Sequence, residues 1–234
     1  MTAATAAQDH ARDPDSELAR HVASGDAAAF AALMRRYNRT LFRAARAILR
    51  DDAEAEDALQ DAYIRAYASM GSFRGEARLS TWLVRIVANE ALARRRRRQR
   101  RAEVVPLHVD AGTGAAPEAD PGGCAPDGPE RAALRAEMCR LIERKIDALP
   151  DDFRLVFVLR AIEEFSVEET AAALAIPQAT VRTRFFRARS LLREALSQEL
   201  DLAFDGAFGF AGARCDRIVA CVLARLRGGG VAPH

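Results

Sequence analysis

Several features that mark common protein classes are missing from this sequence of 234 residues. No apolar run reaches the roughly 18 to 20 residues that a membrane-spanning helix needs. The first residues, MTAATAAQDHARDPDSE, contain neither the charged region nor the apolar region of a signal peptide. We therefore expect a cytoplasmic protein with no membrane insertion.

Cysteine and histidine are few and dispersed. The four cysteines, Cys124, Cys139, Cys215 and Cys221, form no Cys-x-x-Cys pair, and the four histidines are scattered along the chain. These spacings indicate neither a disulfide framework nor a metal site, so we expect no metal and no cofactor.

Enzyme motifs are also missing. The sequence has no glycine-rich phosphate loop, no His-Glu-x-x-His, no nucleophile elbow and no recognisable Ser, His and Asp grouping. Paired carboxylates such as Glu163 and Glu164 lie in an amphipathic context and are interpreted as surface charge. We therefore predict no catalytic residue and no enzymatic activity.

Lysine is almost lacking, since Lys145 is the only one and arginine supplies the other basic residues. Arginine suits bidentate contacts with phosphate and guanine, but a GC-rich genome explains the same bias. The net charge is only +2. A nucleic-acid surface would therefore have to come from segregated charge rather than from an overall excess.

What the sequence does contain is apolar spacing of three and four residues, which predicts an all-α protein. Pro, Gly and Asp interrupt this spacing between two helical stretches. We predict two small helical domains joined by a flexible linker, with a C-terminal helical extension. The segments are a disordered tail (1–15), the first domain (16–101), the linker (102–128), the second domain (129–200), and an extension with one amphipathic helix (201–234).

The first domain begins with a long amphipathic helix from Asp26 to near Arg50. The next helix has an acidic polar face that includes Asp57, Gln60 and Asp61. Such a face is usually only solubilising, so it does not by itself predict a partner.

The segment FRGEARLSTWLVRIVANEALARRRRRQRR joins a polar loop, an apolar helix and an arginine run. Ser80 lies where a helix N-cap is expected. Phe73 and Arg74 offer a stacking ring and a charged hydrogen-bonding group, and the arginines offer charge for phosphates. A solvated helix end explains the arginine run equally well.

In the second domain, Leu134, Met138 and Ile142 belong to an apolar stripe. Ser166 and Glu169 match a capping box that starts a short helix at Val167. A turn and a helix from about Ala179 follow, which is a helix-turn-helix pattern. Ordinary helical hairpins share this pattern. The residues left on the outer face of the last helix are Thr180, Arg182, Thr183, Arg184, Phe186 and Arg187.

The sequence resembles the extracytoplasmic-function (ECF) group of the sigma-70 family of bacterial RNA polymerase sigma factors. The resemblance covers Ser16 to Arg101 and Pro129 to Glu194. It rests on four segments in the family's order and spacing: GDAAAFAALMRRY, EDALQDAYIRAY, SFRGEARLSTWLVRIVANEA and LPDDFRLVFVLRAIEEFSVEETAAALAIPQATVRTRFFRARSLLRE. It implies that the two domains are sigma region 2 and the helix-turn-helix of sigma region 4.

The resemblance also implies partners, namely core RNA polymerase, promoter DNA and, as is usual in this family, an anti-sigma factor. The positions that match the polymerase-binding face are Asp57, Gln60 and Asp61. Those expected to recognise the minus-ten element are Phe73, Arg74, Leu79, Ser80, Trp82, Arg85, Asn89, Arg94 and Arg95. Those expected to read the minus-35 element are Thr180, Arg182, Thr183, Arg184, Phe186 and Arg187. The alternative is a stand-alone helix-turn-helix regulator that binds duplex DNA without being a polymerase subunit.

The extension lies beyond the resemblance. Ile218, Val219, Val222, Leu223 and Leu226 form an amphipathic stripe in it. We interpret this stripe as a docking element, within the chain or for a partner.

Overall fold

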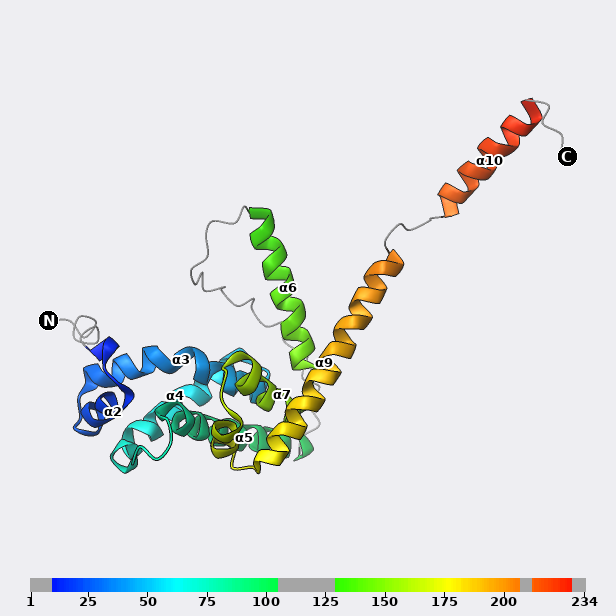
Figure 1. Ribbon diagram of the computed structural model, residues 1–234. Helices are drawn as coiled ribbons and strands as arrows, with labels where there is room; N and C mark the ends of the chain where they lie inside the picture. Colours follow the sequence, from blue (N-terminus) through cyan, green and yellow to red (C-terminus); the bar gives the residue numbers. More distant parts are fainter. Residues whose placement is uncertain (1–9, 105–128, 207–211, 229–234) are drawn as a thin grey trace. The chain divides into compact units, whose positions relative to one another are not determined.

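The computed structural model describes residues 10–104, 129–206 and 212–228, and every regular element in these ranges is helical (Figure 1). The all-α fold class is thereby confirmed. The chain divides into two compact units, Met1–Leu192 and Arg193–His234. The elements are η1 (His10–Arg12), α2 (Asp15–Ala23), α3 (Ala27–Leu49), α4 (Asp52–Ser69), η2 (Met70–Ser72), α5 (Leu79–Val104), α6 (Pro129–Asp147), α7 (Asp151–Phe157), η3 (Val158–Ile162), α8 (Val167–Leu174), α9 (Gln178–Gly206) and α10 (Gly212–Gly228).

The N-terminal segment is more ordered than we predicted. Residues 10–12 form the 3-10 helix η1, and α2 begins at Asp15, although residues 1–15 were expected to be a disordered tail. The groups that hold this segment come from α3 and its N-cap. Arg36 donates to the backbone oxygen of His10 at 3.4 Å, and Asp26 contacts the His10 ring. Periodicity within residues 1–15 could not reveal these longer-range contacts.

Helix α3 is the central element of the first unit and agrees with the predicted long helix. Asp26 caps its N-terminus by accepting hydrogen bonds from the backbone N–H groups of Ala28 and Ala29. Arg50 ends it in the left-handed region with φ of 59°. Helices α2, α4, α5 and α7 all pack against α3.

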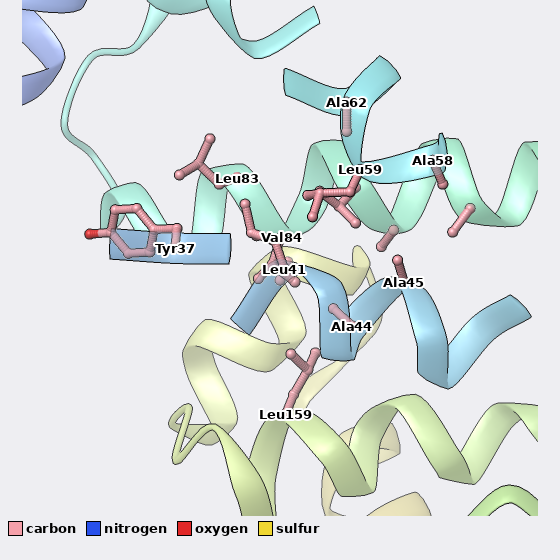
Figure 2. Close-up of a cluster of buried hydrophobic side chains, with 14 of the residues drawn as sticks. Tyr37, Leu41, Ala44, Ala45, Ala58, Leu59, Ala62, Leu83, Val84 and Leu159 are labelled. Atoms are coloured by element: carbon pink, nitrogen blue, oxygen red, sulfur yellow. The ribbon is translucent and has the colours of Figure 1, made fainter. Parts of the chain in front are cut away.

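The apolar side of α3 is buried in the core, where residues from α4, α5 and η3 pack with it (Figure 2). Leu41, Ala44 and Ala45 are fully buried, and the small side chains let neighbouring helices approach closely. Leu159 reaches the same core from η3. The other labelled residues of the cluster are Tyr37, Ala58, Leu59, Ala62, Leu83 and Val84.

The predicted linker lies mostly outside the described residues, except that residues 102–104 form the last turn of α5. Beyond it, α7 and η3 pack against α3, and α8 packs against α5. The described helices of both predicted domains therefore contribute to one unit. The exact domain boundaries remain a prediction.

Two predicted apolar stripes are largely exposed. On α6, the side chains of Leu134, Met138 and Ile142 are 64%, 51% and 37% exposed, whereas Ile146 near its end is buried. On α10, Ile218 is 50% exposed, as are its described apolar neighbours Val219 and Val222. Both segments are helical as predicted, and the docking role of the α10 stripe remains a prediction.

Candidate nucleic-acid interface

The acidic face of α4 displays two of its three predicted residues to solvent. Asp57 and Gln60 are exposed, and Asp61 is half-buried. Arg94 of α5 crosses to this face, where it donates to the backbone oxygen of Asp57 at 3.2 Å and forms an ion pair with the Asp61 carboxylate. The sequence did not predict that a residue from the DNA-binding set would contact the acidic set.

Arg94 is consequently a link between two helices. Its Nε lies 3.4 Å from the carboxylate of Glu90, which is itself only 1% exposed and paired with Arg65 at 2.8 Å. Burial lowers the pKa of Arg94, but the hydrogen bond to Asp61 and the charges of the surrounding carboxylates outweigh burial, so the pKa is raised overall. Neutralising the buried Glu90 is thus one clear role of Arg94.

The loop before α5 begins with a ring pair. Phe73 is half-buried and its ring centroid lies 5.5 Å from that of Trp82, at an interplanar angle of 56°. Arg74 is exposed, whereas Leu79 is only 1% exposed and belongs to the core. Leu79 therefore anchors the loop, and the aromatic pair forms a partly accessible surface beside it.

The predicted N-cap at Ser80 is wrong. Helix α5 already begins at Leu79, and the backbone N–H of Trp82 donates to the carbonyl of Arg78 at 3.1 Å, which places the cap at Arg78. Ser80 is half-buried in the first turn. Serine is a common N-cap residue, and nothing else in the polar loop marks where the helix begins, so the sequence alone shifted the predicted start of α5.

Farther along α5, Arg85 and Asn89 are exposed and four residues apart, so they share one face of the helix. Arg95 is half-buried, and its guanidinium pairs with Asp151 at 2.8 Å. The arginines from Arg96 to Arg98 and at Arg100 and Arg101 are exposed. The phosphate-binding capacity of the run therefore lies mainly in these last residues.

Asp151 collects several positive charges. It accepts hydrogen bonds from Arg154 and Arg50, each at 2.8 Å, in addition to its pair with Arg95. Burial raises the pKa of Asp151, but the hydrogen bond from Arg154 and the charges of Arg95 and Arg50 outweigh burial and lower it. The carboxylate is thus held ionised at the start of α7, where the helix dipole also favours it.

The helix-turn-helix forms as predicted. The Ser166 hydroxyl accepts from the N–H of Glu169 at 3.0 Å, and the Glu169 carboxylate accepts from the N–H of Ser166 at 2.7 Å. This reciprocal capping box starts α8 at Val167. Ala175 ends α8 in the left-handed region, and α9 begins at Gln178, one residue earlier than expected.

The predicted reading residues of α9 differ in accessibility. Val181 and Ala188 are buried and fix the inner face of the helix. Phe186 is 72% exposed, although phenylalanine is among the residue types most often buried in proteins. Arg184 is half-buried and pairs with Asp152 at 3.2 Å. The remaining predicted residues are exposed Arg182, Thr183 and Arg187 and half-buried Thr180.

The second predicted domain contacts the first through ion pairs that the sequence did not indicate. Glu163 was interpreted as surface charge, but its side chain is 6% exposed and accepts hydrogen bonds from Thr40 at 2.6 Å and Arg43 at 2.9 Å. Arg78 in the loop also pairs with Glu169 at 3.1 Å. Because these partners are about 90 to 120 residues apart, no local pattern could have indicated them.

Two family models match this chain, one in each of the two predicted domains. The family model described as Sigma-70 region 2 matches residues 33–101, and the one described as Sigma-70, region 4 matches residues 139–192. The RNA polymerase sigma-H factor of Pseudomonas aeruginosa is 35% identical over 188 residues, covering 79% of this chain and 95% of that protein. The ECF RNA polymerase sigma-E factor of Escherichia coli is 34% identical over 183 residues, covering 76% of this chain and 92% of that protein.

A solved structure has the same fold. It is the sigma factor RpoE in complex with the anti-sigma factor NepR from Bartonella quintana, with a TM-score of 0.58 and 23% identity. The match covers 72% of this chain and 96% of the solved one. In the part of the chain that the structure describes, no helix is both long and apolar enough to cross a membrane.

Proposed function

Since the chain belongs to the ECF group of the sigma-70 family of RNA polymerase sigma factors, we propose that it binds core RNA polymerase and selects promoters through two DNA elements. One observation carries this proposal. A single chain combines an exposed acidic helix face, an aromatic pair beside a polar loop and a helix-turn-helix. We further propose that the protein acts in the cytoplasm and has no enzymatic activity, in keeping with that role.

The polymerase would dock on α4. Asp57 and Gln60 are one helical turn apart, and both are exposed. Asp61 contributes charge at the edge of this face, where Arg94 already partly neutralises it. We therefore assign the larger share of the docking energy to Asp57 and Gln60, because both are exposed and the Asp57 carboxylate lies 3.7 Å from Arg94, farther than that of Asp61.

The minus-ten element would be recognised around Phe73 and Trp82. An unstacked base can stack on an aromatic ring, which is worth about 1–3 kcal/mol per base. Ser80, Arg85 and Asn89 lie along the same helix as Trp82 and offer hydrogen bonds to the base and its backbone. This combination suits a strand that has been separated, because a duplex would keep its bases stacked and out of reach.

The minus-35 element would be read by α9 in the major groove. Arg182 and Arg187 are exposed and suited to phosphate or guanine contacts. Arg184 reaches DNA once its pair with Asp152 is exchanged for a contact with a base or phosphate. Phe186 offers an apolar contact, for example with a thymine methyl group.

The alternative function, a stand-alone helix-turn-helix regulator, predicts different features in the first domain. Such a protein would need the helix-turn-helix but neither the acidic face of α4 nor the ring pair at Phe73 and Trp82. An anti-sigma factor is a further proposed partner, supported by the family and by the solved sigma factor that is in complex with one.

The proposal is tested by measuring the affinity of the purified protein for core polymerase. The double variant Asp57→Ala with Gln60→Ala should lose at least about tenfold in affinity, equivalent to about 1.4 kcal/mol. Glu17→Ala is the matched control, because it removes an exposed acidic charge from a different helix, α2. Equal affinity of the double variant and the parent would remove this face from the interface, and a parent that does not bind would favour the stand-alone regulator.

A further inference from the structure

A cluster of potential metal ligands lies near the N-terminal end of the first compact unit. His10 is the first residue of η1, Asp13 directly follows η1, and His21 belongs to the last turn of α2. Each of the three residues offers one ligand atom, and these atoms lie within 4.8 Å of one another. The two imidazole rings have centroids 5.0 Å apart. The spacing of the histidines in the sequence did not indicate this arrangement.

The backbone brings the three residues together in two steps. The turn of η1 places Asp13 beside His10, with the backbone N–H of Asp13 donating to the carbonyl of His10 at 3.2 Å. The chain then reverses after α2 through Gly25, whose φ of 91° favours glycine. The N–H of Asp26 donates to the carbonyl of His21 at 3.1 Å, which closes the reversal.

A fourth residue, Asp26, fixes the orientation of His10. One carboxylate oxygen of Asp26 accepts from the N-terminal N–H groups of α3. Its other oxygen lies 3.1 Å from Nε2 of His10, while Nδ1 of His10 lies 2.7 Å from the Asp13 carboxylate. In protein metal sites, a histidine that binds the ion through one ring nitrogen usually donates its other ring N–H to a carboxylate, which fixes the orientation of the ring.

We propose that His10, Asp13 and His21 bind one divalent transition-metal ion, with Asp26 as the outer-shell partner of His10. Two imidazoles and one carboxylate suit zinc, nickel or copper better than magnesium or calcium, which prefer oxygen ligands. Three protein ligands with a water molecule complete the four positions that zinc adopts. Binding would displace the proton between Nδ1 of His10 and the Asp13 carboxylate, and these two atoms, 2.7 Å apart without the ion, would separate to admit it.

Binding would brace a part of the chain that supports the proposed minus-ten loop. The ion joins η1 to the end of α2, and α2 packs against α3, α5 and η2. Helix η2 leads directly into Phe73. The His10 segment is also tied to α3 through Arg36, so the metal would add to contacts that already order it.

The proposal is tested by titrating the metal-free full-length protein with Zn²⁺ and measuring heat, and with Co²⁺ and measuring visible absorption. We expect one ion per chain and an absorption band typical of low coordination. His21→Ala should weaken Zn²⁺ binding at least about tenfold. His108→Ala is the matched control, since it removes a histidine that is not one of the proposed ligands, and it should leave the affinity unchanged.

Two further variants keep the test independent of folding. Asp26→Asn preserves the N-cap of α3, because asparagine caps as well as aspartate, but it removes the outer-shell carboxylate. It should weaken Zn²⁺ binding about tenfold to a hundredfold. Asp13→Asn removes a ligand with almost no change in shape and should also weaken binding. Zn²⁺ should raise the melting temperature of the parent more than that of either variant.

The proposal is overturned if the parent binds no Zn²⁺, or if His21→Ala and Asp13→Asn both bind it with the parent's affinity. Binding that is lost only in His108→Ala would place the ion elsewhere and would also overturn it. Mg²⁺ added in excess should not displace Zn²⁺, and displacement would contradict the proposed nitrogen ligands. None of these outcomes depends on polymerase binding, so the metal site is tested separately from the proposed function.

Discussion

Arg154 is the residue whose replacement should most clearly disturb the fold. Its side chain is 0% exposed, and it donates hydrogen bonds to the carbonyl of Ala47 at 2.8 Å, the carbonyl of Leu149 at 2.7 Å and the carboxylate of Asp151 at 2.8 Å. Ala47 lies in the last turn of α3, where carbonyls have no partner within the helix. Arg154 therefore caps α3 from a different helix and places a positive charge at the negative end of its dipole.

The cost of Arg154→Ala follows from these contacts. Burial lowers the pKa of Arg154, although Asp151 opposes this effect, and an arginine remains charged at neutral pH. Removing one partner of a buried ionic group typically costs about 3–5 kcal/mol, and here the buried carbonyl of Ala47 would lose its partner without regaining water. That is a large fraction of the roughly 5–15 kcal/mol by which most domains are stable. Arg154→Lys should cost less, since it keeps the charge but loses the planar fork.

Urea unfolding measures this cost directly, with the fluorescence of the single tryptophan, Trp82, as the signal. Arg20→Ala is the matched control, because Arg20 is exposed on α2, and its replacement should change the free energy of unfolding by no more than about 0.5 kcal/mol. If Arg154→Ala came within about 1 kcal/mol of the parent, the reasoning that Arg154 joins α7 to the end of α3 would be refuted.

Three further predictions concern DNA binding and pH. Arg184→Ala should lower discrimination between the upstream element and unrelated duplexes by about 1–3 kcal/mol in fluorescence anisotropy, whereas an equal loss on all duplexes would indicate a phosphate contact. Phe73→Ala in complex with core polymerase should weaken binding of single-stranded minus-ten DNA by about 1–3 kcal/mol, and unchanged binding would exclude stacking on this ring. The lowered pKa of Asp151 contributes stability above the ordinary value of 3.8, which is lost as the pH falls through the folded-state pKa. In acid unfolding, the free energy of unfolding of Asp151→Asn should therefore fall less over this pH range than that of Asp152→Asn. Identical pH profiles for the two variants would contradict the stabilising role of the Asp151 carboxylate.

Local patterns in the sequence predicted the elements of the fold well. The capping box at Ser166 and Glu169 specified the start of α8 because both partners lie within four residues of each other. The apolar spacing from Asp26 to Arg50 likewise specified α3. Such signals are short-range, and their hydrogen bonds form within the element that they start or end.

Longer-range contacts escaped prediction. Glu163 looked like surface charge because nothing near it in sequence pairs with it, yet Thr40 and Arg43 bury it. The α6 stripe was correctly predicted as helical, but helical periodicity does not reveal whether a partner covers the apolar face. Arg94 similarly looked like a phosphate ligand, since only the fold brings it to Asp61.

Within the candidate site, the family resemblance supplied roles and the structure supplied accessibility. Leu79 illustrates the difference, because its position matches the minus-ten loop while its side chain is 1% exposed. Phe186 illustrates the opposite case, since its position matches the minus-35 helix and its side chain is 72% exposed and therefore accessible to DNA. Which of the predicted residues contact DNA remains a prediction that the variants above address.

The central claim is that this chain directs RNA polymerase to promoters, and run-off transcription on genomic fragments tests it most directly. Purified core polymerase with the protein should yield transcripts that start at discrete sites, preceded by two shared sequence elements. Core polymerase alone should not produce these transcripts, and Asp57→Ala with Gln60→Ala should reduce them. The account would be contradicted if the protein, active in DNA binding, produced no start sites beyond those of core polymerase alone.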